Sequence, residues 1–185
     1  MDAGWLEFLR GTDPPEHAAQ VYRSVDELAA SVAGFLAAGF AAGEPALVIA
    51  TPEHWEVFAA HLAGCGWDAE RALDDGLLQV ADAAATLAGF MSGTAPDAGR
   101  FAQVVGTLVA ETESRFPETT IRAFGEMVDL LARRGQYAAA AAVEELWNDL
   151  SRRHRFSLLC GYHRGVEEDG ALGEVCRIHS RVLLA

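Results

Sequence analysis

The sequence predicts an α/β domain in which helices cover both faces of a mostly parallel sheet, giving a three-layer sandwich. Short β-prone runs alternate with longer runs of helical spacing, which is typical of parallel strands joined by crossover helices. One short run, residues 46–50 (ALVIA), is apolar throughout, as expected for a strand buried on both faces. A length of 185 residues suits one domain with a short extension. We therefore divide the chain into an arm, residues 1–15, and one domain, residues 16–185.

The first elements are predicted from an apolar cluster and a capping pattern. Residues 1–15 carry apolar side chains followed by a glycine and two prolines, and we expect a docking helix or a frayed arm there. The first strand is expected at residues 19–22. Ser24 and Glu27 then form an S-x-x-E capping box, which satisfies unpaired amides at the start of a helix. We expect Gly39 to stop this helix.

The next elements repeat the order of strand, cap and helix. The second strand, residues 46–50, is followed by Thr51 as a helix cap and by Pro52 in the first turn, where a missing N–H group costs nothing. A third strand is expected at residues 77–80. Asp82 is well placed to cap the helix that comes after it.

The second half of the chain continues the alternation, so the whole sequence predicts five strands. In order, it is expected to contain a loose segment at 92–98, a long helix at 98–115, a fourth strand at 120–124, a short helix that begins near Glu126, a helix at 137–153, a fifth strand at 156–161, a charged loop at 167–170 and a last helix at 172–180.

Charge excludes several function classes. The chain has 27 acidic and 14 basic residues, for a net charge of −13, and every basic residue is an arginine. Without lysine there can be no Schiff-base enzyme, no lysine general base and no phosphate loop of the G-x-x-x-x-G-K-[ST] type. The acidic balance also argues against a nucleic-acid surface, which needs basic groups gathered on one face. Any direct DNA contact is expected to belong to another chain.

The cysteines and the hydropathy indicate the cytoplasm. Three cysteines without C-x-x-C spacing, in apolar surroundings, are typical of reduced, buried thiols. The longest uncharged run, residues 28–43, is shorter than the ~20 residues that a membrane span needs, and the N-terminus lacks a basic leader region. We expect a cytoplasmic protein with no membrane contact.

Polar residues at the carboxyl ends of the predicted strands are the candidates for ligand binding, because ligands collect there in open parallel sheets. Helix starts at these ends offer amides to an anionic group. The alternative is that these positions are polar only because caps and loops need polar groups. The candidate ligand-binding residues are His17, Tyr22, Arg23, Thr51, His54, Arg122, Glu126, Tyr162 and His163.

Three of the polar or aromatic positions have more than one interpretation. Glu126 follows a strand end, where a carboxylate acts as a base or ligand anchor, or else as a helix-start acid favoured by the helix dipole. Arg122 lies inside a strand and is expected to pair with an acid, for which Glu126 is one candidate. Trp147 is on an alanine-rich helix, where the spacing favours a core position over a ligand platform.

Metal binding and nucleophilic catalysis are not predicted. His17, His54 and His163 are ligand types, but no H-E-x-x-H, H-x-H or Cys/His spacing supports a metal site. There is no G-x-S-x-G motif, and the capping box already explains Ser24.

Several fragments together carry a family resemblance. They are, in order, His17 with Tyr22, Phe35 to Gly39 with Gly43 and Glu44, Thr51 with Pro52, Arg122 with Gly125, Glu126 and Met127, Glu144 with Leu146, Trp147 and Asn148, Leu159 and Cys160 with Tyr162, and Cys176 with His179 and Ser180. With this order and spacing, the stretch from His17 to Ser180 resembles the MEDS domain, a sensory domain named for methanogens, methylotrophs and the dichloromethane-responsive regulator DcmR. Such domains are similar in turn to the RecA-type, KaiC-like ATPase fold.

The chain departs from a KaiC-like ATPase at the phosphate site. Where that fold carries a glycine-rich loop and a lysine, this chain has residues 22–27 (YRSVDE), in which Asp26 and Glu27 would repel phosphate. Glu126 is the candidate for the Walker-B acid, yet it lies past the apolar part of its strand. With the Walker A loop absent, we expect no ATP hydrolysis by the usual mechanism and no cofactor.

The resemblance implies small-molecule sensing upstream of transcription or histidine-kinase signalling. We therefore expect a non-catalytic sensory or regulatory domain that binds a small molecule at the strand carboxyl ends. Because the chain has no room for a helix-turn-helix or kinase domain, it is expected to act in trans on a histidine kinase, an anti-sigma factor or a transcription regulator. A homodimer through the alanine-rich helix face is a further expectation.

Two other functions are kept open. One is an enzyme, either a divergent nucleotide-binding protein or a small-molecule hydrolase, with Glu126 as the base and His54 or His163 nearby. The other is an interaction module with no ligand, which would bind its partner equally well after Tyr22→Ala.

Overall fold

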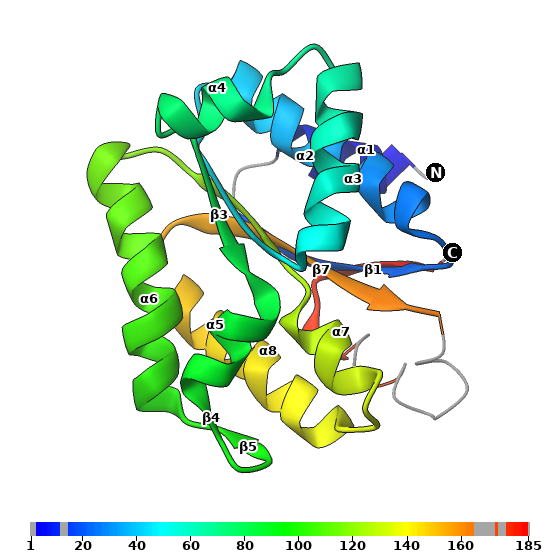
Figure 1. The fold of residues 1–185 in the computed structure, drawn as a ribbon, viewed down its shortest axis with the longest axis vertical. Helices are drawn as coiled ribbons and strands as arrows, with labels where there is room; N and C mark the ends of the chain where they lie inside the picture. Colours follow the sequence, from blue (N-terminus) through cyan, green and yellow to red (C-terminus); the bar gives the residue numbers. More distant parts are fainter. Residues whose placement is uncertain (1–2, 12–14, 165–172, 174–176, 185) are drawn as a thin grey trace.

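The structure, a computed structural model, describes residues 3–11, 15–164, 173 and 177–184. Within these ranges, six strands form one parallel sheet in the order β3-β2-β6-β7-β1-β8, and helices cover both faces (Figure 1). The predicted α/β sandwich with a parallel sheet is therefore confirmed.

The bounds of the elements follow. The strands are β1 (His17–Tyr22), β2 (Ala46–Ala50), β3 (Leu78–Asp82), β6 (Ile121–Gly125), β7 (Phe156–His163) and β8 (Arg181–Leu184), with β4 (Met91–Ser92) and β5 (Ala95–Pro96) forming a separate antiparallel pair. The helices are α1 (Ala3–Arg10), α2 (Val25–Ala41), α3 (Pro52–Gly64), α4 (Ala69–Asp74), α5 (Ala83–Phe90), α6 (Ala98–Arg115), α7 (Met127–Ala132) and α8 (Tyr137–Ser151).

All five predicted strands are present, but the count of five is wrong. The sixth, β8, pairs with β1 at the edge of the sheet, and the short helix α4 was also not predicted. The predicted charged loop at 167–170 lies outside the described residues. Of the predicted last helix, residues 173 and 177–180 are described: 173, 177 and 178 are helical, whereas His179 and Ser180 are not.

Two apolar clusters lie on opposite faces of the sheet because side chains alternate along each strand. In β1, Ala18 and Tyr22 join the cluster with α1 to α4, whereas Ala19 and Val21 join the cluster with α5 to α8. Figure 1 shows these two groups of helices above and below the sheet. Trp147 is 1% exposed and belongs to the second cluster, so it is a core residue.

The predicted helix caps are confirmed by hydrogen bonds. Side-chain oxygens of Ser24, Thr51 and Asp82 accept from backbone N–H groups three residues later, at 3.3, 3.4 and 2.6 Å. Glu27 reaches back to the N–H of Arg23, at 3.1 Å, so the capping box closes one residue earlier than the usual pattern.

Gly39 does not stop its helix, contrary to prediction. Helix α2 continues to Ala41, and the residue with positive φ is Gly43, at +76°. A Cβ atom on Gly39 would lie 2.5 Å from Cγ of Arg122. Gly39 therefore allows the Arg122 side chain from β6 to approach the helix closely, and the helix continues beyond it.

Arg122 pairs with Glu44 and not with Glu126, which was the partner considered from sequence. Its Nε donates to Glu44 Oε2 at 2.5 Å, and its terminal nitrogens donate to the carbonyls of Leu9 and Arg10, both at 3.3 Å. The last two contacts hold the C-terminal end of α1, whose Phe8 ring stacks on Phe35 at 5.2 Å. Helix α1 is thus docked on α2.

Candidate functional site

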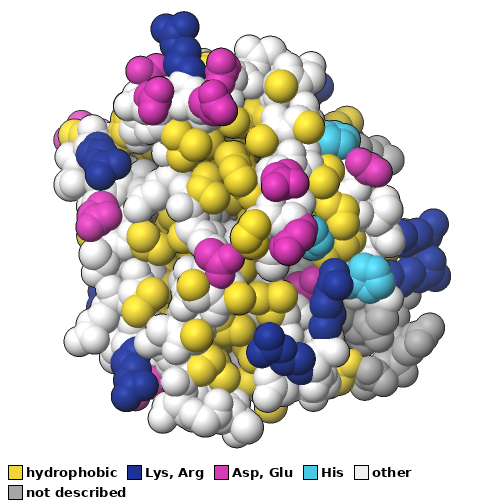
Figure 2. All heavy atoms as spheres, viewed as in Figure 1, with side chains coloured by type: hydrophobic (Ala, Val, Ile, Leu, Met, Phe, Trp, Pro, Cys, Tyr) yellow, Lys and Arg dark blue, Asp and Glu magenta, His cyan; other side chains and the backbone are white. Residues whose placement is uncertain are grey.

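Five of the nine predicted site residues converge at the carboxyl edge of the sheet. Tyr22 ends β1, Thr51 and His54 follow β2, Glu126 follows β6, and His163 ends β7. Parallel strands bring these ends to one edge. On the face shown in Figure 2, arginine and histidine side chains gather toward the right-hand side, where Figure 1 places the end of β7.

Glu126 is the buried centre of the first half of this site. It is 1% exposed, and one carboxylate oxygen lies 2.6 Å from Nδ1 of His54 while the other accepts the N–H of Thr51. Glu126 is the N-cap residue of α7, but its side chain makes no capping hydrogen bond and is directed to His54 and Thr51 instead. The hydrogen bond to Glu126 raises the pKa of His54 above 6.5, although burial opposes this shift.

Asp129 is the buried centre of the second half, and it was missed from sequence. It accepts hydrogen bonds from the Tyr22 hydroxyl at 2.9 Å, from Arg133 Nε at 2.7 Å and from the His163 backbone N–H at 2.7 Å. Arg133 also donates to the Tyr22 oxygen at 2.8 Å. Burial and the Asp129 charge raise the pKa of Tyr22, so the hydroxyl stays protonated as a donor.

One sequence signal for this half was present. Asp129 and Arg133 have the i,i+4 spacing of a helical ion pair. The same i,i+4 spacing occurs in many ion pairs on exposed helix surfaces. What makes this pair different is that Asp129 is 2% exposed, and burial of this kind depends on β1 and β7 packing beside α7.

The geometry links two buried carboxylates to groups at the surface. The side chain of His54 is 14% exposed and that of Arg133 is 47% exposed, and His163 is exposed. The Tyr22 ring lies edge-on to both His54 and His163, with centroids 6.2 and 5.5 Å apart. These surface groups can donate hydrogen bonds to a small polar or anionic ligand, and His54 can also carry a proton.

Of the other four predicted site residues, Arg23 follows β1 at the same edge and is exposed, and three lie elsewhere. Arg122 lies beside α1 and α2. His17 and Tyr162 face α8 on the other side of the sheet, where both contact Glu144, at 3.2 and 2.6 Å. The predicted set is therefore divided among three places in the fold.

Around Glu144 lies a cluster that no sequence spacing revealed. We define the buried His–Cys cluster as His17, Glu144, Cys160 and His179, whose ligand-type atoms all lie within 4.8 Å of one another. These residues come from β1, α8, β7 and the segment before β8. Because no two of them are close enough in sequence to form a known motif, the pattern is visible only in three dimensions.

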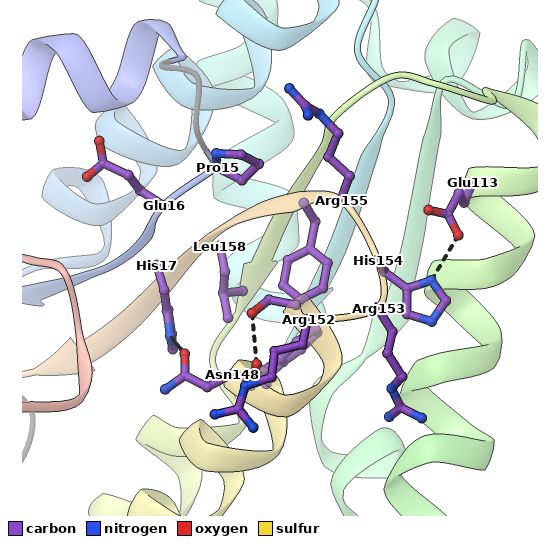
Figure 3. A pocket seen from close by; sticks show the side chains of 13 residues that line it. Pro15, Glu16, His17, Glu113, Asn148, Arg152, Arg153, His154, Arg155 and Leu158 are labelled. Atoms are coloured by element: carbon purple, nitrogen blue, oxygen red, sulfur yellow. Dashed lines mark hydrogen bonds and ion pairs between the residues drawn. The ribbon is translucent and has the colours of Figure 1, made fainter.

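A cavity of about 450 Å³ lies at the opposite, amino-terminal edge of β1 and β7 (Figure 3). His17 and Asn148 line one side of it, and the Glu113–His154 pair, 2.8 Å apart, lines another. Arginines of the α8–β7 connection also line it. This cavity was not predicted, because in parallel sheets ligands are expected at the carboxyl ends of the strands.

Between β1 and α2, a helix cap stands where a KaiC-like ATPase has its phosphate loop. Ser24 caps α2 with its own side chain, and Asp26 and Glu27 occupy the first turn. The helix start thus carries acidic groups and its own cap, as the sequence indicated. The Walker A loop is absent.

The fold is shared with a known structure. A KaiC-like protein from the hyperthermophilic archaeon Pyrococcus horikoshii OT3 superposes with a TM-score of 0.63 over 91% of this chain and 71% of that chain, at 16% sequence identity. No protein with a curated description matches. In the part of the chain that the structure describes, no helix has the length and apolarity needed to span a membrane.

The family follows from the sequence comparison. Residues 16–180 match the model of the MEDS family, described as the MEthanogen/methylotroph, DcmR Sensory domain. The match begins just before β1 and includes every strand of the sheet except β8. The chain therefore belongs to the MEDS family of sensory domains.

Proposed function

We propose that this chain is a non-catalytic, cytoplasmic sensory domain that binds a small polar or anionic molecule at the carboxyl edge of its sheet. The observation that carries the proposal is the pair of buried carboxylates, Glu126 and Asp129, joined to the surface groups His54, Arg133 and His163. A ligand held by these surface groups would act on both networks at once. Membership of a sensory family supports the same role.

The proposed ligand is a small organic molecule and not a nucleotide. In the ATPase fold, phosphate is held by backbone amides of a glycine-rich loop and by a lysine. Here Ser24 caps the helix that would face the phosphate, and the chain has no lysine. A guanidinium and two imidazoles suit a carboxylate or hydroxyl group on a small organic molecule better than a triphosphate with Mg²⁺.

The domain is proposed to act in trans on a signalling or transcription partner. The net charge of −13 favours association with a basic partner surface. Because β1, β2, β6 and β7 all end at the site, a ligand there can shift several elements together.

Thermal unfolding with a panel of small carboxylates and alcohols, and separately with ATP and Mg²⁺, tests the proposal. A ligand at 100 times its Kd stabilises the folded state by about 2.7 kcal/mol. We expect stabilisation by at least one small organic compound and none by ATP with Mg²⁺. The stabilisation should be lost in Arg133→Ala and His54→Ala.

His61→Ala is the matched control, because His61 lies on the same helix as His54 and its ring is paired with the exposed Asp26, at 3.4 Å. Loss of stabilisation in Arg153→Ala, with retention in His54→Ala, would move the ligand to the cavity of Figure 3. Turnover of a small ester or amide that disappears in Glu126→Gln would replace sensing by the enzyme alternative.

A further inference from the structure

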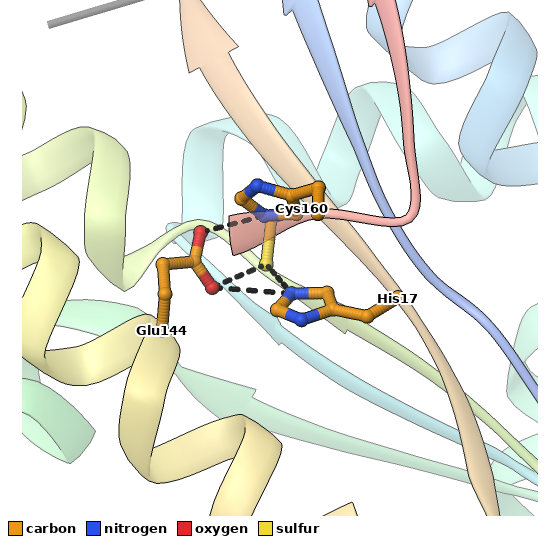
Figure 4. Close-up of side chains that lie close together, drawn as sticks. His17, Glu144 and Cys160 are labelled. Carbon is orange, nitrogen blue, oxygen red and sulfur yellow. Dashed lines mark hydrogen bonds and ion pairs between the residues drawn. The ribbon is translucent and has the colours of Figure 1, made fainter. Parts of the chain in front are cut away.

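The buried His–Cys cluster contains four side chains that bind transition metals. Figure 4 shows His17, Glu144 and Cys160 converging, from β1, α8 and β7. Glu144 and Cys160 are fully buried, and the side chain of His17 is 12% exposed. The proposed sensory site, at the carboxyl edge, uses none of these residues.

We propose that His17, Glu144, Cys160 and His179 bind a zinc ion. Zinc bonds of about 2.0–2.3 Å in a tetrahedron place neighbouring donor atoms roughly 3.3–3.7 Å apart. Nε2 of His17 lies 3.4 Å from Cys160 Sγ and 3.2 Å from Glu144 Oε2, and these last two atoms are 3.3 Å apart. Nε2 of His179 lies 3.0 Å from Glu144 Oε1. A small inward or outward shift of each side chain gives the zinc geometry.

The charges of these side chains also suit a divalent cation. One thiolate and one carboxylate neutralise Zn²⁺, and two neutral imidazoles complete four ligands. Zinc would displace the proton of the Cys160 thiol, as it does in other thiolate sites.

Neighbouring residues hold two of the ligands in the orientation that zinc requires. Nδ1 of His17 lies 2.8 Å from Oδ1 of Asn148, which fixes the proton on Nδ1 and leaves Nε2 as the donor that faces the cluster. The Tyr162 hydroxyl donates to Glu144 Oε1 at 2.6 Å and leaves Oε2 beside His17 and Cys160. Partners of this kind are typical of protein zinc sites.

The cavity at the amino-terminal edge lies next to the cluster. His17 lines its wall together with Asn148, whereas Glu144 and Cys160 are fully buried (Figure 3). A cation that enters the cavity would therefore meet His17 first.

Metal binding would fasten the last strand. His179 lies two residues before β8, and the other three ligands belong to β1, α8 and β7. Zinc would thus hold the edge strand against the sheet, and its removal would loosen β8 first. The bound metal would then attach the C-terminal segment to the rest of the sheet.

Zinc content and cobalt substitution test the proposal. The full chain, with Cys65 and Cys176 both replaced by serine, retains Cys160 as its single cysteine. We expect one zinc per chain after purification with added zinc, and an intense thiolate-to-cobalt absorption band after Co²⁺ exchange. Both should be lost on adding Cys160→Ser, whereas Cys65→Ser alone should change neither, since Cys65 is exposed.

Asn148→Ala provides a second variant, because it leaves all four ligands in place. We expect it to weaken zinc binding by roughly 10–100-fold. X-ray absorption of the zinc-loaded wild-type chain should show one sulfur and three nitrogen or oxygen neighbours, and it needs no variant that risks misfolding. Absence of zinc and of the cobalt band from folded wild-type protein would overturn the proposal, as would a zinc ion with no sulfur neighbour or with two.

Discussion

At the scale of single residues, the most informative contact is between His54 and Glu126. The carboxylate is 1% exposed and takes part in two hydrogen bonds, one with the imidazole and one with the Thr51 N–H group. Its pKa is raised above 6.5, chiefly by the hydrogen bond to Glu126. A histidine with a raised folded-state pKa adds stability at pH values below its unfolded pKa, and this stability is lost as the pH rises through the folded pKa.

Replacement of Glu126 by glutamine should lower the pKa of His54, because burial remains while the favourable hydrogen bond and charge are lost. The change is measured by NMR titration of the His54 ring. The stability difference between wild type and Glu126→Gln should be largest below pH 6.5 and should narrow above the folded pKa of His54. A stability difference that is independent of pH would contradict this assignment. His61→Gln is the control, since that ring is paired with an exposed acid.

At the scale of elements, helix α2 depends on a glycine that the sequence pattern marked as a stop. The Cβ atom that Gly39→Ala adds would lie 2.5 Å from Arg122 Cγ, so the substitution forces the arginine or the helix to move. We expect a destabilisation of about 1–3 kcal/mol, as for other overpacked positions. Urea unfolding measures it.

The same helix offers the matched control. A Cβ atom on Gly34 meets nothing within 4 Å, so Gly34→Ala should stabilise α2 by roughly 0.5–1 kcal/mol through helix propensity alone. Equal changes in stability for Gly39→Ala and Gly34→Ala would show that the close approach of Arg122 to Gly39 does not destabilise the first variant.

The docking of α1 depends on Arg122. Arg122→Met removes the donors to the Leu9 and Arg10 carbonyls and leaves Glu44, 22% exposed, without its partner. We expect a loss of about 2–4 kcal/mol and faster amide hydrogen exchange in residues 3–10. Arg71→Met, which breaks an exposed pair with Asp75, should change stability by less than ~0.5 kcal/mol and leave exchange in α1 unchanged.

The elements show what a sequence can and cannot predict. Caps at Ser24, Thr51 and Asp82 and the apolar strand Ala46–Ala50 were predicted because those signals act over a few residues. The partner of Arg122 was not, because Glu44 lies 78 residues away and local spacing carries no information on it. Strand β8 was missed because its four residues are too few to show an alternation of apolar and polar side chains.

The candidate sites show the same difference between local sequence signals and contacts that depend on long-range packing. Residues at strand ends, such as Tyr22 and His54, could be placed together because a parallel sheet brings those ends to one edge. The faces of the strands were harder to assign. His17 and Tyr162 belong to the side of the sheet covered by α8, and only the packing of that helix brings Glu144 to them.

At the scale of the whole molecule, β8 closes one edge of the sheet. It pairs with β1 over four positions, from Ala18 opposite Arg181 to Val21 opposite Leu184. Residues of β1 are buried on both faces, so without β8 the strand would present a flat, apolar edge with unpaired backbone groups. Figure 1 shows the C-terminus beside β1.

Removal of residues 181–185 should therefore both destabilise the protein and cause it to associate. Two partly buried side chains, Val182 and Leu183, and one ladder of backbone hydrogen bonds are lost, for which we expect about 3 kcal/mol. Arg181→Ala removes the ion pair with Glu16, at 3.2 Å, but keeps the strand, and it should cost less than ~1 kcal/mol. Urea unfolding together with light scattering distinguishes the two, because only the truncated chain exposes β1. A truncated chain that stays monomeric and as stable as Arg181→Ala would mean that β1 tolerates an open edge, and that β8 contributes little to the stability of the sheet.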